Sequence, residues 1–365
     1  MVEDYYTNPA ISQSQLKLLL GPDPSIFNTI QEPDLYFEEK KHFIIGDGVD
    51  MQLTRPIEEF NQKFHISNLQ NKPSDTIKSI VNQVFDEVKA FNNRNPNLDQ
   101  TIGNIQEYPE YILLGCNDHE YQMRWNENTR INKVVEAWEY WEDLKAAEGK
   151  TVLSQEENDL ISQIVMSIRT NPTTSKYFET SKDIEILDQL AIYFTYNNVD
   201  CKALLDRVII NHKDKTIQPI DIKTMGDYTI NFPKSLRQRR YDIQTAFYVE
   251  ALKSKQVYKT YKILPFKFIV ESTVNPGNPL VFTCSSELLR IGQYGAPKTD
   301  IYGKISSSGY DHMSDYKSIS TSEIKGFHQL IEDYKWYQEN GFETKREIVE
   351  AQGELEINWN GITNF

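Results

Sequence analysis

Cysteine is scarce in this chain of 365 residues, which contains three cysteines: Cys116, Cys201 and Cys284. They lie far apart and form no C-x-x-C pair, so the sequence offers neither a cysteine zinc site nor the four thiolates of an iron–sulfur cluster. Free thiols are typical of a reducing compartment, and we therefore expect a cytoplasmic protein.

Long apolar runs are also missing. No stretch reaches the roughly 20 residues that a membrane-spanning helix needs, and the first residues lack a signal-peptide pattern. The sequence contains no internal repeat and no long low-complexity linker. We expect no membrane partner and one compact domain overall.

Positive charge is in deficit, because 39 Lys and Arg residues face 53 Asp and Glu residues and leave a net charge of −14. This balance argues against a generally basic protein that coats nucleic acid. It still allows binding through a local basic groove, and such contacts would be confined and sensitive to salt.

The stretch from Cys201 to Asp227 predicts a β-hairpin. Residues 201–210 and 216–223 are rich in β-branched side chains, and a polar loop at 211–215 joins them. Because side chains alternate along a strand, Asp221 and Lys223 share one face, and the hairpin can bring Asp206 close to Asp221. Two converging carboxylates repel each other, so a divalent cation such as Mg²⁺ or Mn²⁺ is the natural group to lie between them.

Downstream, residues 233–252 predict a helix. Ile243, Phe247 and Ala251 recur at helical spacing and form a core stripe, while Gln244 and Tyr248 lie one residue round from it.

The helix begins with a cluster of arginines, Arg237, Arg239 and Arg240. Such a cluster is often only solvated, but here it flanks the hairpin, which favours contact with phosphate groups.

The order Asp206, then Asp221-Ile222-Lys223-Thr224, resembles the catalytic core of the PD-(D/E)XK nuclease superfamily. The following Gln244-x-x-x-Tyr248 resembles the Q-x-x-x-Y helix of its RecB-type and RecE-type exonucleases, the exonuclease VIII kind. The resemblance implies an α/β fold with a restriction-endonuclease-like core, in which helices flank a mixed central sheet.

The resemblance also implies roles for these residues. Asp206, Asp221 and the Ile222 carbonyl would hold the metal, while Lys223 would orient or deprotonate the attacking water or stabilise charge on the phosphate. Gln244 and Tyr248 would position the strand near the cut. Thr224 and the arginine cluster would contact DNA.

Two positions depart from the family pattern. The run GDGVD at residues 46–50 stands where the family shows G-T-x-x-H with a metal-binding His, and Gln189 falls where a Glu is usual. Asp50 is either a metal ligand, since Mg²⁺ prefers oxygen donors, or a solvated or capping residue. Gln189 removes a charge from the site, for which Glu185 or Asp188 could substitute.

Three segments follow from this pattern. Residues 1–56 are expected to give N-terminal helices of the nuclease core, 57–180 a large and mainly helical insertion, and 181–365 the catalytic core with C-terminal elements. Further expected elements are helices at 11–20, 37–54, 74–92, 131–148, 154–169 and 323–339, a hairpin at 107–125, and strands at 185–197, 261–271 and 276–283.

The function that the resemblance implies is a Mg²⁺-dependent, sequence-independent exodeoxyribonuclease acting on duplex DNA ends in recombination or repair, of a phage-like kind. It implies a ring-like homo-oligomer and partnership with a single-strand annealing recombinase. Two alternatives stay open: a catalytically impaired homologue that binds DNA or assists assembly, and an interaction protein on an unrelated α/β fold.

Overall fold

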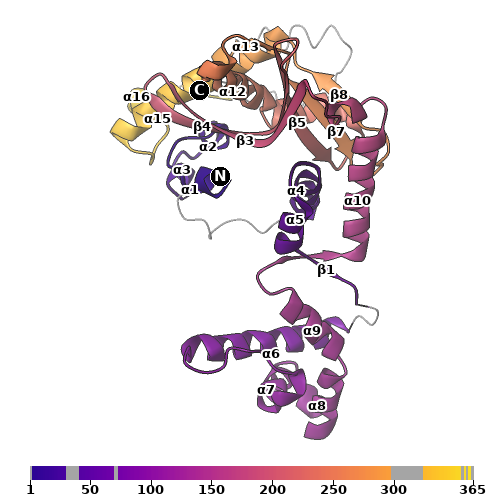
Figure 1. The fold of residues 1–365 in the computed structure, drawn as a ribbon. Coiled ribbons are helices and arrows are strands. Elements are labelled where there is room, and N and C mark those ends of the chain that lie inside the picture. The colour runs from indigo at the N-terminus through magenta and orange to yellow at the C-terminus, as the bar shows by residue number, and fades with distance from the viewer. Residues whose placement is uncertain are drawn as a thin grey trace. The chain divides into compact units, whose positions relative to one another are not determined.

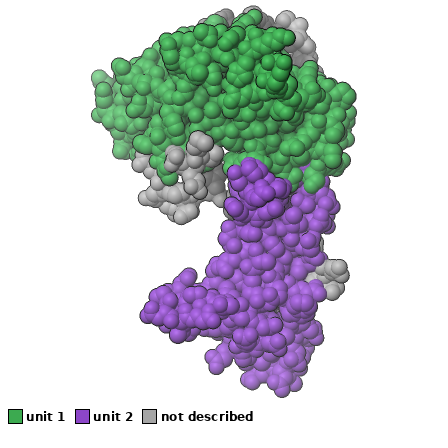
Figure 2. Space-filling model, viewed as in Figure 1, with its two compact units in different colours: residues 1–55, 162–365 green, residues 56–161 purple. Residues whose placement is uncertain are grey.

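The computed structural model describes residues 2–29, 41–69, 73–296 and 324–354, with short pieces at 357–358 and 361–362. The chain divides into two compact units, which Figure 2 shows in different colours. Unit 1 comprises residues 1–55 and 162–365, and unit 2 comprises residues 56–161. None of the helices in the described ranges is both long and apolar enough to cross a membrane.

Unit 1 is built on a mixed sheet, and the chain is therefore α/β as expected (Figure 1). The strand order is β3-β4-β5-β7-β8, with the short β6 paired to β5. Neighbours are antiparallel except for the parallel pairs β5–β7 and β5–β6. The strands are β3 (Ile184–Tyr196), β4 (Val199–Asn211), β5 (Thr216–Met225), β6 (Lys262–Ile263), β7 (Lys267–Ser272) and β8 (Leu280–Thr283).

The predicted hairpin at 201–223 is confirmed as β4 and β5, and the strand expected at 185–197 is β3. A two-residue turn, Asn197-Asn198, joins β3 to β4 with both residues at positive φ. Asparagine tolerates this left-handed conformation, which the tight turns of hairpins require.

Helix α12 (Tyr241–Ser254) connects the parallel strands β5 and β7 and covers one face of the sheet, while α4 (Lys41–Thr54) lies on the other (Figure 1). The predicted core stripe of α12 is confirmed, because Ile243, Phe247 and Ala251 are fully buried. Helices α2 (Gln13–Leu18), α13 (Ser286–Tyr294) and α15 (Phe327–Asn340) pack against α12.

Local capping signals fix two helix starts that the sequence predicts. Ser12 and Gln15 form a reciprocal capping box at α2. Ser154 and Glu157 do the same at α10 (Gln155–Thr170), where the Glu157 carboxylate accepts from the Ser154 N–H. Each box satisfies backbone N–H groups that a helix start leaves without partners.

Unit 2 has a core of its own, centred on the fully buried Trp141. Its elements are α5 (Ile57–Lys63), β1 (Phe64–Ser67), α6 (Asp75–Arg94), α7 (Pro109–Asp118), α8 (Glu127–Val135), α9 (Trp138–Ala146) and β2 (Thr151–Ser154), with β1 parallel to β2. Residues 162–180, which the sequence analysis places in an insertion at 57–180, belong to unit 1.

The hairpin expected at 107–125 is wrong, because this segment forms helix α7 between the 3₁₀ turns at Ile105–Glu107 and Tyr121–Met123. Ile112 and Cys116 are four residues apart and both fully buried, a helical rather than a strand period. Pro109 occupies the first helical turn, where its missing N–H costs nothing.

Three continuous elements expected from the sequence are interrupted. The helix at 131–148 divides into α8 and α9. The strand at 261–271 divides into β6 and β7 around Pro265, which lacks the N–H that a ladder needs. The helix at 233–252 divides into α11 (Phe232–Gln238) and α12, because Arg240 adopts a left-handed conformation between them.

The other elements confirm or extend the expectations at the ends of unit 1. Helix α15 corresponds to the helix expected at 323–339 and β8 to the strand at 276–283. Helix α4 corresponds to the helix at 37–54, of which residues 37–40 lie outside the described residues. The remaining elements are α1 (Val2–Thr7), α3 (Ile26–Thr29), α16 (Arg346–Glu350), β9 (Ile357–Asn358), β10 (Gly361–Ile362) and 3₁₀ turns at Ser175–Tyr177, Thr229–Asn231 and Gln256–Tyr258.

Candidate active site

Asp206 and Asp221 meet where strands β4 and β5 separate. Paired residues run from Asn211↔Thr216 to Arg207↔Ile220, and the next pair would be Asp206 and Asp221. Beyond that point the Ile222 N–H donates to Asp206 Oδ2 (3.0 Å) rather than to the neighbouring strand. Asp221 lies close enough to Asp206 to raise the pKa of that carboxyl, so the structure brings together the acids that the sequence pairs.

The environment of these acids opposes two negative charges. Asp221 is 1% exposed. Burial and the charge of Asp221 raise the pKa of Asp206 to about 7, against an ordinary value of 3.8. A shared proton or a cation is therefore needed for both groups to remain in place near neutral pH.

Lys223 supplies one such cation, with its Nζ 2.6 Å from Asp221 Oδ2. Burial alone would lower the pKa of Lys223, but the carboxyls of Asp221 and Asp206 outweigh it and raise the pKa above its ordinary value. Lys223 consequently keeps its proton, which favours charge stabilisation over proton abstraction as its role in this state.

Helix α12 places an amide against the second acid. Gln244 Nε2 donates to Asp221 Oδ1 (2.6 Å), and both side chains are buried. One turn later, burial and the nearby Asp206 and Asp221 raise the pKa of Tyr248 well above its ordinary value. The helix residues singled out by the sequence thus face the acids of the hairpin.

Asp50 and Gln189 form a second pair beside Asp206. Gln189 Nε2 donates to Asp50 Oδ2 (3.0 Å) and to Thr54 Oγ1 (3.1 Å), and its Oε1 accepts from Arg55 Nη2 (3.4 Å). Burial and the charge of Asp206 raise the pKa of Asp50 to about 7. The two residues that depart from the family pattern therefore contact each other.

The backbone at Gln189 is unusual for a strand. Its φ is +50°, and it falls out of the β3–β4 ladder between the pairs Asp188↔Arg207 and Leu190↔Leu205. A left-handed non-glycine residue inside a strand costs free energy, and such residues concentrate at functional sites. The sheet is therefore distorted on both sides of Asp206.

The alternative charge sources, Glu185 and Asp188, are engaged elsewhere. Asp188 forms a two-pronged ion pair with the buried Arg207 (2.6 and 2.8 Å). Glu185 contacts His212 at the far end of the hairpin.

The donor set at the fork fits a hard divalent cation. Asp221 Oδ2 is buried and has Lys223 Nζ as its partner at 2.6 Å, and the carboxyl of Asp206 lies beside it. Among the residues that the structure describes, no group of three or more His, Cys, Asp or Glu side chains is arranged to hold a metal ion. Two carboxylates would suit Mg²⁺ or Mn²⁺, because Mg²⁺ often binds one or two protein carboxylates and completes its shell with water and phosphate. The Ile222 carbonyl as a further ligand stays a prediction. Asp50 as a direct ligand stays a prediction.

The predicted DNA-contacting residues fall into two groups. Arg240 is fixed by Asp242 (2.8 Å) and by the Lys325 carbonyl (2.7 Å). Thr224 faces α4, where its Oγ1 lies 3.0 Å from the position of a Cβ on Gly46. Arg237 and Arg239 are exposed, and within the described part of the chain neither makes an ion pair.

Lys17 is a site residue that the sequence analysis missed. Its Nζ on α2 lies 3.4 Å from the Arg239 carbonyl and 5.8 Å from the centre of the Tyr241 ring, over which Lys223 Nζ also lies at 5.2 Å. Burial and the charge of Lys223 lower the pKa of Lys17 to about 8. No sequence signal points to it, because about 200 residues separate it from the hairpin and only packing on α12 brings it near.

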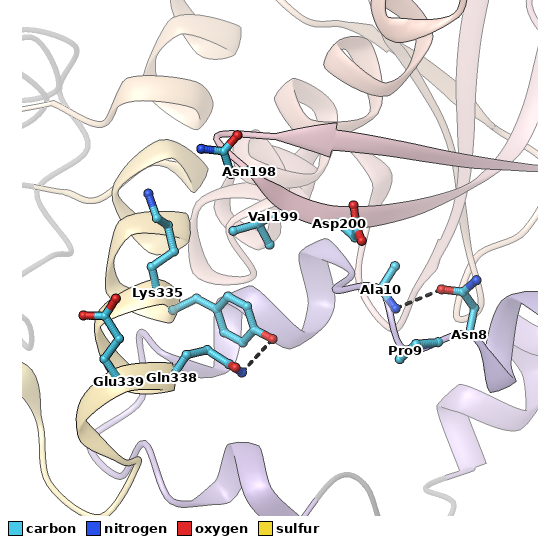
Figure 3. Close-up of a pocket in the computed structure, with 10 residues that line it drawn as sticks. Asn8, Pro9, Ala10, Asn198, Val199, Asp200, Lys335, Gln338 and Glu339 are labelled. Carbon is cyan, nitrogen blue, oxygen red and sulfur yellow. Dashed lines mark hydrogen bonds between the residues drawn. The ribbon is translucent and has the colours of Figure 1, made fainter.

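A pocket of about 580 Å³ lies elsewhere on unit 1 (Figure 3). Residues 8–10, the β3–β4 turn and one face of α15 line it, including Asp200 and Lys335. It contains none of the predicted site residues, so the carboxyl fork is a separate feature.

Comparisons with known proteins add little to this geometry. Neither protein-family models nor curated protein sequences give a match. A solved structure from Eubacterium rectale, described as a candidate exonuclease, shares 13% identity over 80% of this chain and 79% of its own, with a TM-score of 0.42. A protein from Vibrio cholerae shares 12% identity over 57% of this chain and 50% of its own, with a TM-score of 0.17. Similarity this low supports no argument about activity, which must come from the site.

Proposed function

We propose that this protein is a metal-dependent deoxyribonuclease with a PD-(D/E)XK type of catalytic centre, acting as a sequence-independent exonuclease on duplex DNA ends. The observation that carries the proposal is the assembly of Asp206, Asp221 and Lys223 at the β4–β5 fork, with Gln244 fixing Asp221 from the following helix. This is the arrangement that the D…DxK and Q-x-x-x-Y pattern requires.

The residues divide the chemistry of phosphodiester hydrolysis between them. Asp206 and Asp221 would hold Mg²⁺ or Mn²⁺, which supplies a Lewis acid for the phosphate and a more acidic water. Gln244 keeps Asp221 in one orientation, and Tyr248 lies buried one turn later, near both acids.

Two ammonium groups add positive charge near the fork. Lys223 lies beside Asp221, and Lys17 shares the ring of Tyr241 with it. Fixed charges directed at a phosphate in a partly buried site stabilise the additional negative charge of the transition state. Charges of this kind would contact phosphates rather than base edges, and we therefore propose cleavage without sequence preference.

The wider biology of the proposal follows the family resemblance. It includes a role in recombination or repair in the cytoplasm, a homo-oligomer around DNA and partnership with a single-strand annealing recombinase.

The test is release of acid-soluble nucleotides from linear duplex DNA with Mg²⁺. Wild-type protein should release them, and chelation of the metal should stop the reaction. Asp221→Ala and Lys223→Ala should lower the rate at least 100-fold, whereas Lys213→Ala, an exposed lysine in the β4–β5 loop, should leave it unchanged. No release by the wild type in Mg²⁺ or Mn²⁺ would contradict the nuclease proposal.

A second candidate function rests on the Asp50–Gln189 contact. The Gln189 amide donates a hydrogen bond to the carboxylate of Asp50, the group that would otherwise be offered to a metal. A protein with this pair could bind DNA or assist assembly without cutting it. The same experiment separates the two functions, because such a protein would bind the duplex equally well in Mg²⁺ and in EDTA and release no nucleotides.

A further inference from the structure

The segment after β5 is unusual in a chain with a net charge of −14. Residues 228–240, with the sequence YTINFPKSLRQRR, contain four basic residues and no acidic residue. Arg240 is paired with Asp242, but Lys234, Arg237 and Arg239 are exposed. We call residues 228–239 the basic strip.

The strip begins with two exposed apolar side chains. Tyr228 is 60% exposed and Ile230 is 69% exposed, although both follow a strand whose other apolar residues are buried. An aromatic ring and an aliphatic side chain are therefore both available to a ligand on this turn.

These side chains stand on a well-defined turn. Asp227 accepts from the Tyr228 N–H (2.7 Å) and from Asn231 Nδ2 (2.9 Å), and the Asn231 N–H bonds back to the Tyr228 carbonyl (2.9 Å). The acid that precedes the strip is therefore engaged in holding the turn. Thr229 Oγ1 adds a contact to the Asn278 carbonyl (3.5 Å) in the β7–β8 loop.

The strip is continuous with the carboxyl fork. At one end of the strip, Lys223 lies five residues before Tyr228. At the other end, Lys17 Nζ lies 3.4 Å from the Arg239 carbonyl. Lys17 Nζ and Lys223 Nζ lie 5.8 Å and 5.2 Å, respectively, from the centre of the Tyr241 ring. Phe232 stacks on Tyr241 and thereby fixes α11 between the two ends. Exposed basic residues therefore occur along the chain between the turn at Tyr228 and the Lys17 contact at Arg239.

We propose that the basic strip binds single-stranded DNA, with the Tyr228 ring stacking on a base beside Ile230 and with Arg237 and Arg239 contacting phosphates. A positive groove with aromatic platforms is the usual means of holding a strand without reading its sequence. The inference rests on the proposed function, because it makes the strand at the strip the unpaired end of the DNA that enters the site. The enzyme would then prefer frayed or single-stranded ends to blunt ones.

The test measures binding without cleavage, in EDTA, by fluorescence anisotropy of a labelled 20-nucleotide single strand and of a blunt duplex. Tyr228→Ala should weaken single-strand binding roughly 10-fold, from the usual contribution of one stacked base, and change duplex binding little. Tyr228→Phe should bind like the wild type because it keeps the ring. Val257→Ala, another exposed apolar position, is the matched control. Arg237→Ala should reduce the salt slope for the single strand by about 0.7, the value for one phosphate contact.

The outcomes separate this inference from the proposed function. If Tyr228→Ala binds the single strand as tightly as the wild type does, the inference is wrong, and the apolar pair would be left for a protein partner. If the protein binds through Tyr228 but releases no nucleotides in Mg²⁺, the strip is retained and the nuclease proposal fails.

Discussion

Replacing Asp206 by Asn should make the metal-free protein more stable while removing its activity. The carboxyl of Asp206 is held against Asp221 in a site that raises its pKa from 3.8 to about 7. At about 1.4 kcal/mol per pKa unit, this shift of about 3 units corresponds to about 4 kcal/mol of unfavourable free energy for the charged form. Asp206 is partly exposed to solvent, which weakens the effect of the charge. We therefore expect Asp206→Asn to raise the free energy of unfolding by about 2–4 kcal/mol at pH 8.

The pH dependence has a definite sign. Between about pH 4 and 7 the folded protein holds a proton on Asp206 that the unfolded chain has already released. The free energy of unfolding must therefore fall as the pH rises through this range. Asp206→Asn removes this contribution and keeps an oxygen that can accept from the Ile222 N–H. A smaller fall should remain, because the pKa of Asp50 is also raised to about 7.

The assay is urea unfolding in EDTA at pH 5 and pH 8, followed by titration with Mg²⁺ at pH 8. The wild type should be less stable at pH 8 than at pH 5 and should regain stability with Mg²⁺ by mass action, whereas Asp206→Asn should gain little. Asp200→Asn, an exposed position on the same strand, serves as the control and should resemble the wild type. If Asp206→Asn is no more stable than the wild type at pH 8 in EDTA, the electrostatic account of the fork is incorrect.

Two other substitutions test the supports of the site. Gln244→Leu removes the donor to Asp221 Oδ1, and we expect it to lower kcat for DNA hydrolysis at least 10-fold with little change in KM. Gln256→Leu, on the surface, is the control and should leave kcat unchanged. An unchanged kcat in Gln244→Leu would show that the amide does not orient the acid. Arg207→Met leaves the Asp188 carboxylate without its ion-pair partner and removes the hydrogen bonds to the Leu53 and Tyr177 carbonyls. Because a charge is then left unpaired in the fold, we expect a loss of about 3–5 kcal/mol in the free energy of unfolding, measured by thermal unfolding. The double variant Arg207→Met/Asp188→Leu should recover part of that loss, and equal melting of single and double variants would contradict a buried-charge penalty.

Much of the fold was predictable wherever the deciding interactions are local. The capping boxes at Ser12 and Ser154 and the two strands joined by a polar loop at 201–223 are short-range patterns, and the structure contains all of them. The alternation expected along the second strand does not appear in its burial, because residues 217–222 of β5 are all buried. Predictions were wrong where two periods competed. The aromatic run at 107–125 suits strands by composition, but burial of Ile112 and Cys116 on one side makes it a helix.

The sequence by itself determined which residues meet at the fork. An Asp and a Lys two residues apart on a strand must share a face, a short loop must return the chain beside Asp206, and a Gln one turn before a Tyr must present both on one side of a helix. Only the tertiary structure decided what surrounds these groups. The left-handed Gln189 bonded to Asp50, the approach of Lys17 to Lys223, and the exposure of Tyr228 all depend on packing between segments far apart in the chain. Burial, which sets the pKa of Asp206, exists only after these segments have come together.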